Sequence, residues 1–395
     1  MSDPWVTIIG LTESGKADLG VAAIEAIENA DLVIGGARHL ELVAAGDKGQ
    51  PWPIPFAITP VLEARGKQVV VLASSDPFWF GAGSTLADAL KPGEWTAIPA
   101  PSTFALATST LGWRLEETLC MGLHAAPFEQ LTPVLCPGQK IIATVRDGAA
   151  VGELASWLTA NGFGPSTLHV LEALGGPRQN VRAAKAQTFD LKDVQAPVSV
   201  AITPAGSKGL PRASGLDNDY FAHDGQITKQ AVRAMTLSAL APSPGQVLWD
   251  LGAGSGSISV EWCLSAPRTR AYAVERREDR AVNIRQNIQR FGLGHRMELT
   301  VSPSIEALAD LPDPDAVFIG GGANKDLLSA LWDRLPAGTR LVVNGVTLDT
   351  ETLLAEWHAA KGGHLLRVEL SEVQPLGSMR GWTPARPVTQ WSVTT

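Results

Sequence analysis

Short apolar runs, mostly of β-branched residues, recur along the chain, and each is followed by a turn-forming stretch and then by residues of helical spacing. These runs cover residues 6–9, 69–73, 141–144 and 198–202 in the first half, and 247–250, 270–275, 315–319 and 341–344 in the second. Strands that are buried under helices on both faces of a parallel sheet are continuously apolar. The pattern therefore predicts two α/β domains, with a doubly wound parallel sheet in the second.

One segment between these two sets of strands lacks apolar periodicity. Residues 204–219 have the sequence PAGSKGLPRASGLDND, which is rich in proline, glycine, serine and aspartate. Such a composition is typical of a linker. We therefore expect a first domain over residues 1–205, a linker over 206–218 and a second domain over 219–395, in which residues 227–240 have helical spacing.

The most distinctive motif of the second half directly follows the predicted strand at 247–250. Residues 250–256 have the sequence DLGAGSG, and Glu275 closes the next predicted strand. Glycines let the backbone turn tightly and approach a ligand, and a carboxylate at the end of the second strand can accept hydrogen bonds from ribose hydroxyls. The motif therefore predicts a nucleoside-binding site.

Two ligand classes compete for this site. A dinucleotide fingerprint has the spacing GxGxxG, whereas here the third glycine comes early and Ser257 stands where that fingerprint has glycine. Asp250 precedes the loop, and a carboxylate there repels phosphate but suits a cation. S-adenosylmethionine carries a sulfonium and an ammonium group and no phosphate, so the pattern favours it over a nicotinamide dinucleotide. A glycine-rich turn without any ligand is the third possibility.

Three further stretches of the second half are candidates for ligand contact. Thr228, in HDGQITK just before the predicted helix, is either an N-cap or a site residue. The triplet at 320–322, GGG, follows a strand and lies at the edge where open α/β sheets bind ligands. Residues 377–382, GSMRGW, form either an ordinary hairpin or a loop that closes over a ligand, with Trp382 presenting a ring face.

Composition narrows the classes of function. A formal net charge of -8 opposes a general binder of nucleic acid or of anionic membranes. No apolar stretch of about 20 residues is present to span a bilayer, and the first ten residues, MSDPWVTIIG, lack the basic region of a signal peptide. Cys120, Cys136 and Cys263 show no metal-binding or disulfide spacing. We therefore expect a soluble cytoplasmic protein without a bound metal.

Several segments of the second half resemble the methyltransferases of cobalamin biosynthesis that methylate a corrin precursor and decarboxylate its acetate side chain. They are HDGQITKQAVRAMTLSAL, DLGAGSGSISVEW, AVERREDRAVNIRQNIQRFG, PDAVFIGGG and LVVNGVTLDT. The first half resembles the tetrapyrrole methylases in VTIIG, VVVLASSDPFWFG, IPAPSTFALATSTLGW, ATVRDG and VLEALGGPRQNV. The combination is similar to the family of fused precorrin-6Y C(5,15)-methyltransferases (decarboxylating).

This resemblance implies an α/β protein with an N-terminal tetrapyrrole methylase fold and a C-terminal doubly wound, Rossmann-like class I methyltransferase fold. Each domain would bind S-adenosylmethionine. The implied substrate is an anionic tetrapyrrole, precorrin-6B, and the implied product is precorrin-8. The C-terminal domain would methylate carbon 15 and decarboxylate the acetate at carbon 12, and the N-terminal domain would methylate carbon 5. The resemblance also implies a homo-oligomer that binds neither nucleic acid nor a membrane.

The resemblance also implies which residues surround the methyl donor. In the C-terminal domain they are Thr228, Gly252, Ala253, Gly254, Ser255, Gly256, Glu275 and Ser304, and in the N-terminal domain they are Gly10, Asp76, Gly81, Ser102, Thr103 and Ala173. The chain departs from the family pattern at Ser75, where Gly-Asp-Pro is usual, and at residues 11–15, LTESG, where Gly-x-Gly-Pro is usual. Residues 302–308, SPSIEAL, replace the usual Gly-x-Ala-Pro-Glu-Ala-Leu.

Methyl transfer from a sulfonium to an electron-rich carbon is an in-line displacement, so the enzyme chiefly aligns the reactants and excludes water. No catalytic residue follows from this, and the candidates are His223 as a general acid, Lys229 and Arg380. Side chains that could bind substrate carboxylates are Arg146, Arg178, Arg182, Lys229, Arg233, Arg380 and Arg386. Three alternatives stay open: an RNA methyltransferase, a nicotinamide oxidoreductase, and a chain whose N-terminal half is a non-catalytic scaffold.

Overall fold

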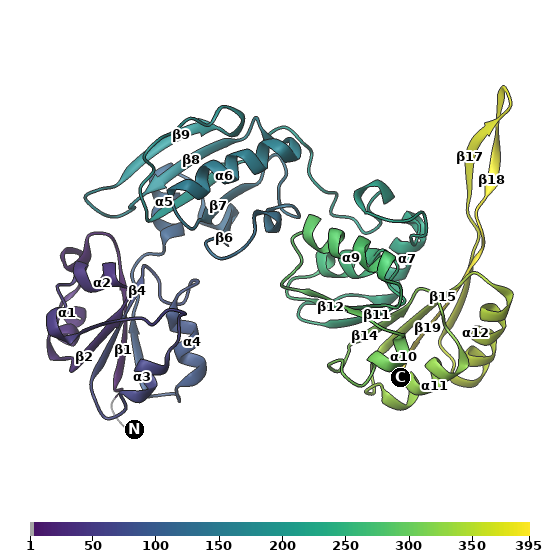
Figure 1. The fold of residues 1–395 in the computed structure, drawn as a ribbon, viewed down its shortest axis with the longest axis horizontal. Helices are drawn as coiled ribbons and strands as arrows, with labels where there is room; N and C mark the ends of the chain where they lie inside the picture. Colours follow the sequence, from purple (N-terminus) through teal and green to yellow (C-terminus); the bar gives the residue numbers. More distant parts are fainter. Residues whose placement is uncertain (1–3) are drawn as a thin grey trace. The chain divides into compact units, whose positions relative to one another are not determined.

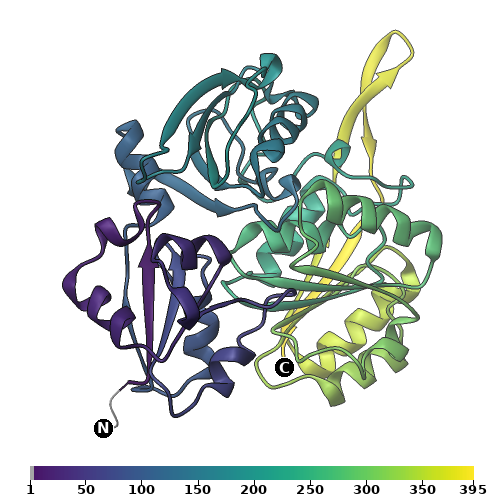
Figure 2. The same cartoon turned by 60° about the vertical axis from the view of Figure 1, so that its left-hand side comes forward.

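The chain forms two compact units in the computed structural model, which describes residues 4–395 (Figures 1 and 2). The start of the segment compared above with a signal peptide lies outside the described residues. The first unit comprises the chain up to Phe128 together with Leu135–Lys208, and the second comprises Glu129–Val134 and Gly209–Thr395. No helix in the described part of the chain is long and apolar enough to cross a membrane.

The first unit begins with a parallel sheet of strand order β3-β2-β4-β1-β5. Its elements are β1 (Val6–Leu11), α1 (Val21–Asn29), β2 (Leu32–Gly35), α2 (Ala37–Leu42), β3 (Gly49–Pro51), α3 (Thr59–Glu63), β4 (Val69–Ser74), α4 (Ala82–Ala89) and β5 (Trp95–Ile98). Alternate residues of β1 enter two apolar clusters, with Val6 and Ile8 in one and Ile9 and Leu11 in the other. Helices therefore cover both faces of this sheet, as the continuous apolar runs predict.

A second sheet of the first unit has the order β6-β7-β10-β8-β9. Its elements are α5 (Thr103–Leu111), β6 (Thr118–Gly122), β7 (Lys140–Thr144), α6 (Gly148–Leu158), β8 (Thr167–Glu172), β9 (Asn180–Lys185) and β10 (Val198–Thr203). Only β6 and β7 pair in parallel, and the other pairs are antiparallel. The predicted strands at 141–144 and 198–202 are confirmed as β7 and β10, although their antiparallel pairing was not predicted.

The second unit contains a sheet of order β13-β12-β11-β14-β15-β19-β16. Its elements are α7 (Gln230–Leu240), β11 (Val247–Leu251), α8 (Ser257–Ser265), β12 (Arg270–Glu275), α9 (Glu278–Arg290), β13 (Met297–Val301), α10 (Ser304–Ala307), β14 (Ala316–Ile319), α11 (Lys325–Arg334), β15 (Arg340–Gly345), α12 (Leu348–Lys361), β16 (His364–Val368) and β19 (Val388–Thr394). Along β11, Leu248 lies in one apolar cluster, and Trp249 and Leu251 lie in the other. The predicted doubly wound fold is confirmed, with β19 antiparallel to both of its neighbours.

The segment GSMRGW at 377–382 lies in a hairpin, so the simpler of the two predictions for it is confirmed. Strands β17 (Ser371–Leu376) and β18 (Met379–Pro384) form a two-stranded sheet that extends from the rest of the second unit (Figures 1 and 2). The side chains near its tip are exposed, including those of Leu376, Met379 and Trp382.

The second unit also includes a piece of chain that comes from between β6 and β7. Gly292, with a φ of +63°, packs so closely on Glu129 that a Cβ would clash with the Glu129 carbonyl oxygen. The Gln130 Nε2 atom lies 3.3 Å from the His295 Nδ1 atom. Residues Glu129–Val134 are therefore a structural part of the second unit, although the first domain was expected to span residues 1–205.

Part of the expected linker is likewise packed. The backbone N–H groups of Gly215 and Leu216 donate to the Glu261 carboxylate at 2.6 and 2.9 Å, and Leu216 is buried. At Gly215 and Leu216 this turn-forming stretch is thus anchored to the second unit, where a buried carboxylate accepts two of its backbone hydrogen bonds.

Candidate functional site

The glycine-rich loop of the second unit joins β11 to α8. Gly252, Gly254 and Gly256 have φ angles of +71°, +61° and +71°, which side-chain-bearing residues rarely adopt. A Cβ on Gly252 would lie 2.7 Å from the Gly321 carbonyl oxygen, so this loop adjoins the GGG turn that follows β14. The strand order reverses between β11 and β14, and ligands of open α/β sheets bind where the order reverses.

Glu275 closes this site from the end of β12. Its side chain is buried, and its Oε2 atom accepts a hydrogen bond from the Gly254 N–H at 2.9 Å. Its Oε1 atom accepts one from the Arg277 N–H, also at 2.9 Å. Each carboxylate oxygen keeps a further lone pair. The carboxylate is therefore held in one orientation and can still accept hydrogen bonds from a ribose diol.

Asp250, at the inner end of the loop, is buried beside α8. Its Oδ2 atom accepts hydrogen bonds from the Ser259 N–H at 3.2 Å and the Ser259 hydroxyl at 2.7 Å. Its Oδ1 atom has no hydrogen-bond partner within residues 4–395. Burial raises the pKa of Asp250 to about 6, the bonds from Ser259 oppose this rise, and the charge of Glu275 adds to it. Asp250 therefore supplies a negative potential beneath the loop at neutral pH and loses it in mild acid.

Ala222, the residue before the segment HDGQITK, is linked to the glycine loop through Asn287 of α9. The Ala222 N–H donates to Asn287 Oδ1 at 2.8 Å, and Asn287 Nδ2 donates to the Ser255 carbonyl at 2.9 Å. The N-cap prediction for Thr228 is wrong, because Lys229 occupies that position of α7. Thr228 is half-buried and its carbonyl accepts a hydrogen bond from Arg233.

The other predicted donor residues of the second unit have different positions. Ser304 is half-buried at the first position of α10, and Ser255 is buried within the glycine loop. A Cβ on Gly254 would have the Gln226 carbonyl oxygen, 3.9 Å away, as its nearest neighbour, so this part of the loop is open. The glycine loop, Glu275 and the segment before α7 are thus brought together on one edge of the sheet.

The candidate cations of the second unit differ in burial. The prediction that Arg233 binds a substrate carboxylate is wrong, because its side chain is fully buried and its Nε atom binds the Glu261 carboxylate at 2.5 Å. Its guanidinium lies over the Phe221 ring, 4.6 Å from the centroid. Lys229 is exposed, Arg380 is exposed on β18, and His223 accepts a hydrogen bond from the Gly225 N–H at 2.9 Å.

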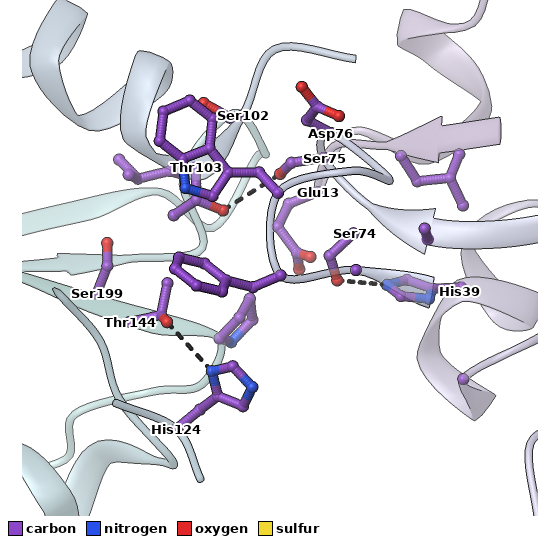
Figure 3. A pocket seen from close by; sticks show the side chains of 18 of the residues that line it. Glu13, His39, Ser74, Ser75, Asp76, Ser102, Thr103, His124, Thr144 and Ser199 are labelled. Atoms are coloured by element: carbon purple, nitrogen blue, oxygen red, sulfur yellow. Dashed lines mark hydrogen bonds between the residues drawn. The ribbon is translucent and has the colours of Figure 1, made fainter. Parts of the chain in front are cut away.

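The first unit contains a pocket of about 420 Å³ that is lined by both of its sheets (Figure 3). Four of the predicted donor residues line it, namely Asp76, Gly81, Ser102 and Thr103. The Asp76 Oδ1 atom accepts a hydrogen bond from the Phe78 N–H at 2.9 Å. Ser102 is the N-cap of α5 and accepts one from the Ala105 N–H at 3.1 Å.

Gly10 and Ala173 support this pocket through the backbone. A Cβ on Gly10 would clash with the Ser75 carbonyl oxygen, so glycine is needed for the approach of β1 to the turn after β4. The Ala173 N–H donates to the Pro197 carbonyl at 2.9 Å, between Leu171 and Leu174, which line the pocket.

Ser75, which departs from the family pattern, has a φ of +53°. This left-handed backbone explains why glycine is usual at that position. The Ser75 N–H donates to the Leu11 carbonyl at 2.7 Å, and its hydroxyl lies 3.3 Å from the Thr103 hydroxyl (Figure 3). Because the serine keeps the turn and adds a contact with Thr103, the departure leaves the pocket intact.

Sequence reasoning missed most of the polar lining of this pocket, such as Arg38, His39, Ser74, His124 and Thr144. His39 Nε2 lies 2.9 Å from Ser74 Oγ, and His124 Nδ1 lies 3.3 Å from Thr144 Oγ1 (Figure 3). Burial and the charge of Arg38 lower the pKa of His39 to about 4. A signal did exist, since Arg38 and His39 follow a short apolar strand and two glycines. Within residues 4–395 no cluster of His, Cys, Asp or Glu is arranged to hold a metal ion.

Comparison with known proteins covers both halves of the chain. Residues 6–190 match the model of the Tetrapyrrole (Corrin/Porphyrin) Methylases, and residues 219–395 match that of the Precorrin methyltransferase domain. A precorrin-6Y C(5,15)-methyltransferase [decarboxylating] from Sinorhizobium sp is 45% identical over 99% of this chain and 96% of its own length. One from Mycobacterium tuberculosis (strain ATCC 25618 / H37Rv) is 36% identical over 98% of this chain and 99% of its own.

A solved structure is similar to the second half of the chain. It is the crystal structure of the C-terminal domain of precorrin-6Y C5,15-methyltransferase from Rhodobacter capsulatus, which is 52% identical and covers 47% of this chain and 100% of its own, with a TM-score of 0.46. These relatives do not support the alternative of an RNA methyltransferase. Enzymes of this kind use S-adenosylmethionine. The full-length relatives place the chain in the family of the precorrin-6Y C(5,15)-methyltransferases (decarboxylating).

Proposed function

We propose that this chain carries out two methylations and one decarboxylation on precorrin-6B, each unit with its own S-adenosylmethionine. The second unit methylates carbon 15 and releases carbon dioxide from the acetate at carbon 12. The first unit methylates carbon 5, and the product is precorrin-8. The assignment of the chain to the cytoplasm stays a prediction from its cysteines and N-terminal sequence, and its self-association stays a prediction from the family resemblance.

The observation that carries this proposal is the presence of a separate candidate donor site in each unit. The second unit has the glycine loop with Glu275 at the carboxyl edge of its sheet. The first has a pocket of about 420 Å³ lined by Asp76, Ser102 and Thr103. The two sites are built from different folds and share no residue, so each unit can bind one molecule of the methyl donor.

The residues of the second unit fit a cationic nucleoside. We assign Glu275 to the ribose hydroxyls and the backbone of residues 252–256 to close approach by the ligand, with Thr228 and Ser304 at its border. Asp250 lies below the loop, where a negative charge favours a cation over a phosphate. The donor supplies an electrophilic methyl group, and these residues hold it in line with the accepting carbon and keep water away.

Methylation and decarboxylation place different demands on the chain. In methyl transfer the substrate carbon attacks the methyl group, the sulfur–carbon bond breaks, and the sulfur leaves with its electron pair; the methylated carbon then releases its proton to solvent. In decarboxylation the bond to the carboxyl carbon breaks, its electron pair enters the conjugated macrocycle, and a proton then completes the new methyl group. The protein has to orient the acetate and supply that proton. His223 and Lys229 are our candidates, because they belong to the segment at 223–229, whose Gln226 carbonyl oxygen lies next to Gly254 of the glycine loop.

The test follows both activities in the full chain, with precorrin-6B and a donor that carries a labelled methyl group. Wild-type protein is expected to add two labelled methyl groups and release one carbon dioxide per substrate. Glu275→Gln should lose carbon dioxide release and the carbon 15 methyl group, whereas Asp76→Asn should lose only the carbon 5 methyl group. If a substitution in one unit abolished both methylations of precorrin-6B, the proposed division of labour between the two units would be wrong.

A further inference from the structure

Two arginines line the pocket of the first unit, and their surroundings differ in charge. Arg146 is shared by two carboxylates, with its Nε atom 2.8 Å from Asp147 and its Nη2 atom 3.0 Å from Glu153. Arg38 is bound to Glu13, and the same carboxylate is 3.3 Å from Arg178. One guanidinium thus faces two carboxylates at Arg146, whereas two guanidiniums share one carboxylate at Glu13. The excess of positive charge is therefore shared by Arg38 and Arg178, of which Arg38 lines the pocket.

The other neighbours of Arg38 do not cancel this excess. Its Nη2 atom lies 3.1 Å from His39 Nε2 and 3.4 Å from Ser74 Oγ. Because the pKa of His39 is lowered to about 4 by burial and by Arg38, its imidazole is neutral at pH 7. The cluster therefore keeps one uncompensated positive charge, and the Arg38 side chain is 36% exposed and can be reached from the pocket.

Glu13 is held firmly enough to orient Arg38. Its side chain is only 10% exposed. The next residue, Ser14, donates its hydroxyl hydrogen bond to the Gly175 carbonyl at 2.6 Å. A Cβ on Gly176 would clash with Glu13, so the two loops pack tightly. A carboxylate that is fixed in this way restricts the guanidinium it binds, since such charge-assisted bonds are directional.

The same pocket presents flat apolar surface. Trp79 and Phe80 line it and are 40% and 58% exposed. Both rings lean on Phe104, with centroid separations of 5.2 and 6.1 Å. Exposed rings backed by a buried ring suit the face of a planar conjugated ligand. Figure 3 shows that Asp76, Ser102 and Thr103, the candidate donor residues, lie on a different side of the pocket from His39.

We infer that Arg38, positioned by Glu13, binds a carboxylate of the tetrapyrrole substrate in the first unit, while Trp79 and Phe80 contact the face of the macrocycle. Arg38 is then a substrate-binding residue and Glu13 a positioning residue. The inference rests on the proposed function of the first unit as a methyltransferase.

The test measures addition of the carbon 5 methyl group by the full chain at varied concentrations of precorrin-6B and of S-adenosylmethionine. Arg38→Gln should raise KM for the precorrin by about tenfold, as expected for the loss of one charge-assisted hydrogen bond. KM for the donor and the release of carbon dioxide should not change. Glu13→Gln should raise the precorrin KM by a smaller factor, and Arg38→Lys should restore part of the affinity because it keeps the charge.

The matched control is Arg65→Gln. Arg65 is paired with Glu94 in the same unit, and neither residue belongs to the pocket lining. This control should leave both KM values unchanged. An unchanged KM for S-adenosylmethionine in carbon 5 methylation reports in every variant that the first unit is folded, and the Lys variant gives a second measurement if the Gln variant folds poorly.

Two outcomes separate this inference from the proposed function. If the wild-type chain adds the carbon 5 methyl group and Arg38→Gln and Arg38→Lys both keep the wild-type KM for the precorrin, the inference is wrong and the proposed function stands. If the wild-type chain adds no methyl group at carbon 5, the proposed function of the first unit fails, and the inference fails with it.

Discussion

The buried carboxyl group of Asp250 gives a prediction about stability that can be worked out from the structure. Asp250 is 1% exposed, and burial raises its pKa from 3.8 to about 6. An acid whose pKa is higher in the folded state binds a proton more tightly when folded. Asp250 therefore stabilises the folded state in acid. The free energy of unfolding falls as the pH rises from about 4 to about 6 and is constant above that range.

The size of this effect follows from the two pKa values. Since a tenfold change in proton affinity is worth about 1.4 kcal/mol, the whole pH-dependent loss is about 3 kcal/mol, of which roughly 1 kcal/mol falls between pH 5 and pH 7.5. Asp250→Asn carries no ionisable group and cannot show this loss. Its free energy of unfolding relative to wild type should therefore rise by roughly 1 kcal/mol over that interval.

Calorimetric unfolding at a series of pH values measures this difference in free energy of unfolding. The transition to follow is that of the second unit, which contains Asp250. Ser259→Ala serves as the companion variant, because it removes the hydroxyl hydrogen bond, which opposes the pKa rise, and keeps the backbone N–H bond. It should extend the pH-dependent loss above pH 6. Parallel stability curves for wild type and Asp250→Asn between pH 5 and pH 7.5 would refute the argument that Asp250 is a desolvated, titrating group.

Three further variants test other parts of the account. Glu275→Gln places an amide where the N–H groups of Gly254 and Arg277 need an acceptor. The affinity of the second unit for S-adenosylmethionine, measured by calorimetric titration, should therefore fall by about tenfold or more. Gly292→Ala should lower the melting temperature more than Gly245→Ala, because both positions have positive φ but only Gly292 packs against Glu129; equal shifts would mean that Glu129–Val134 is not docked. Arg233→Met leaves a buried carboxylate unpaired and should cost about 3 kcal/mol or more in chemical denaturation.

Much of the fold was predictable because the strongest signals in the sequence are local. The apolar runs at 69–73 and 247–250 are continuous because helices cover both faces of their sheets, and both are strands in the structure. The second sheet of the first unit was harder to predict. Its strands β8 and β10 are also apolar, and a run of this kind does not distinguish parallel from antiparallel pairing.

The candidate site of the second unit was predicted more completely than that of the first. The glycine loop and Glu275 are close in sequence and belong to one βαβ motif, so their spacing alone brings them together. The first pocket combines Arg38, Ser74, Thr103 and His124, which are far apart in the chain and meet only through tertiary packing. The same reason explains the error at Arg233, since its burial against Glu261 depends on the packing of α7 on α8.

The central claim is that each unit binds its own methyl donor, and the stoichiometry of binding tests it most directly. Titration of the full chain with S-adenosylhomocysteine in a calorimeter should give two molecules bound per chain, and Glu275→Gln should weaken one of them while the other keeps its affinity. A wild-type stoichiometry of one, or loss of both binding events in Glu275→Gln, would contradict the claim.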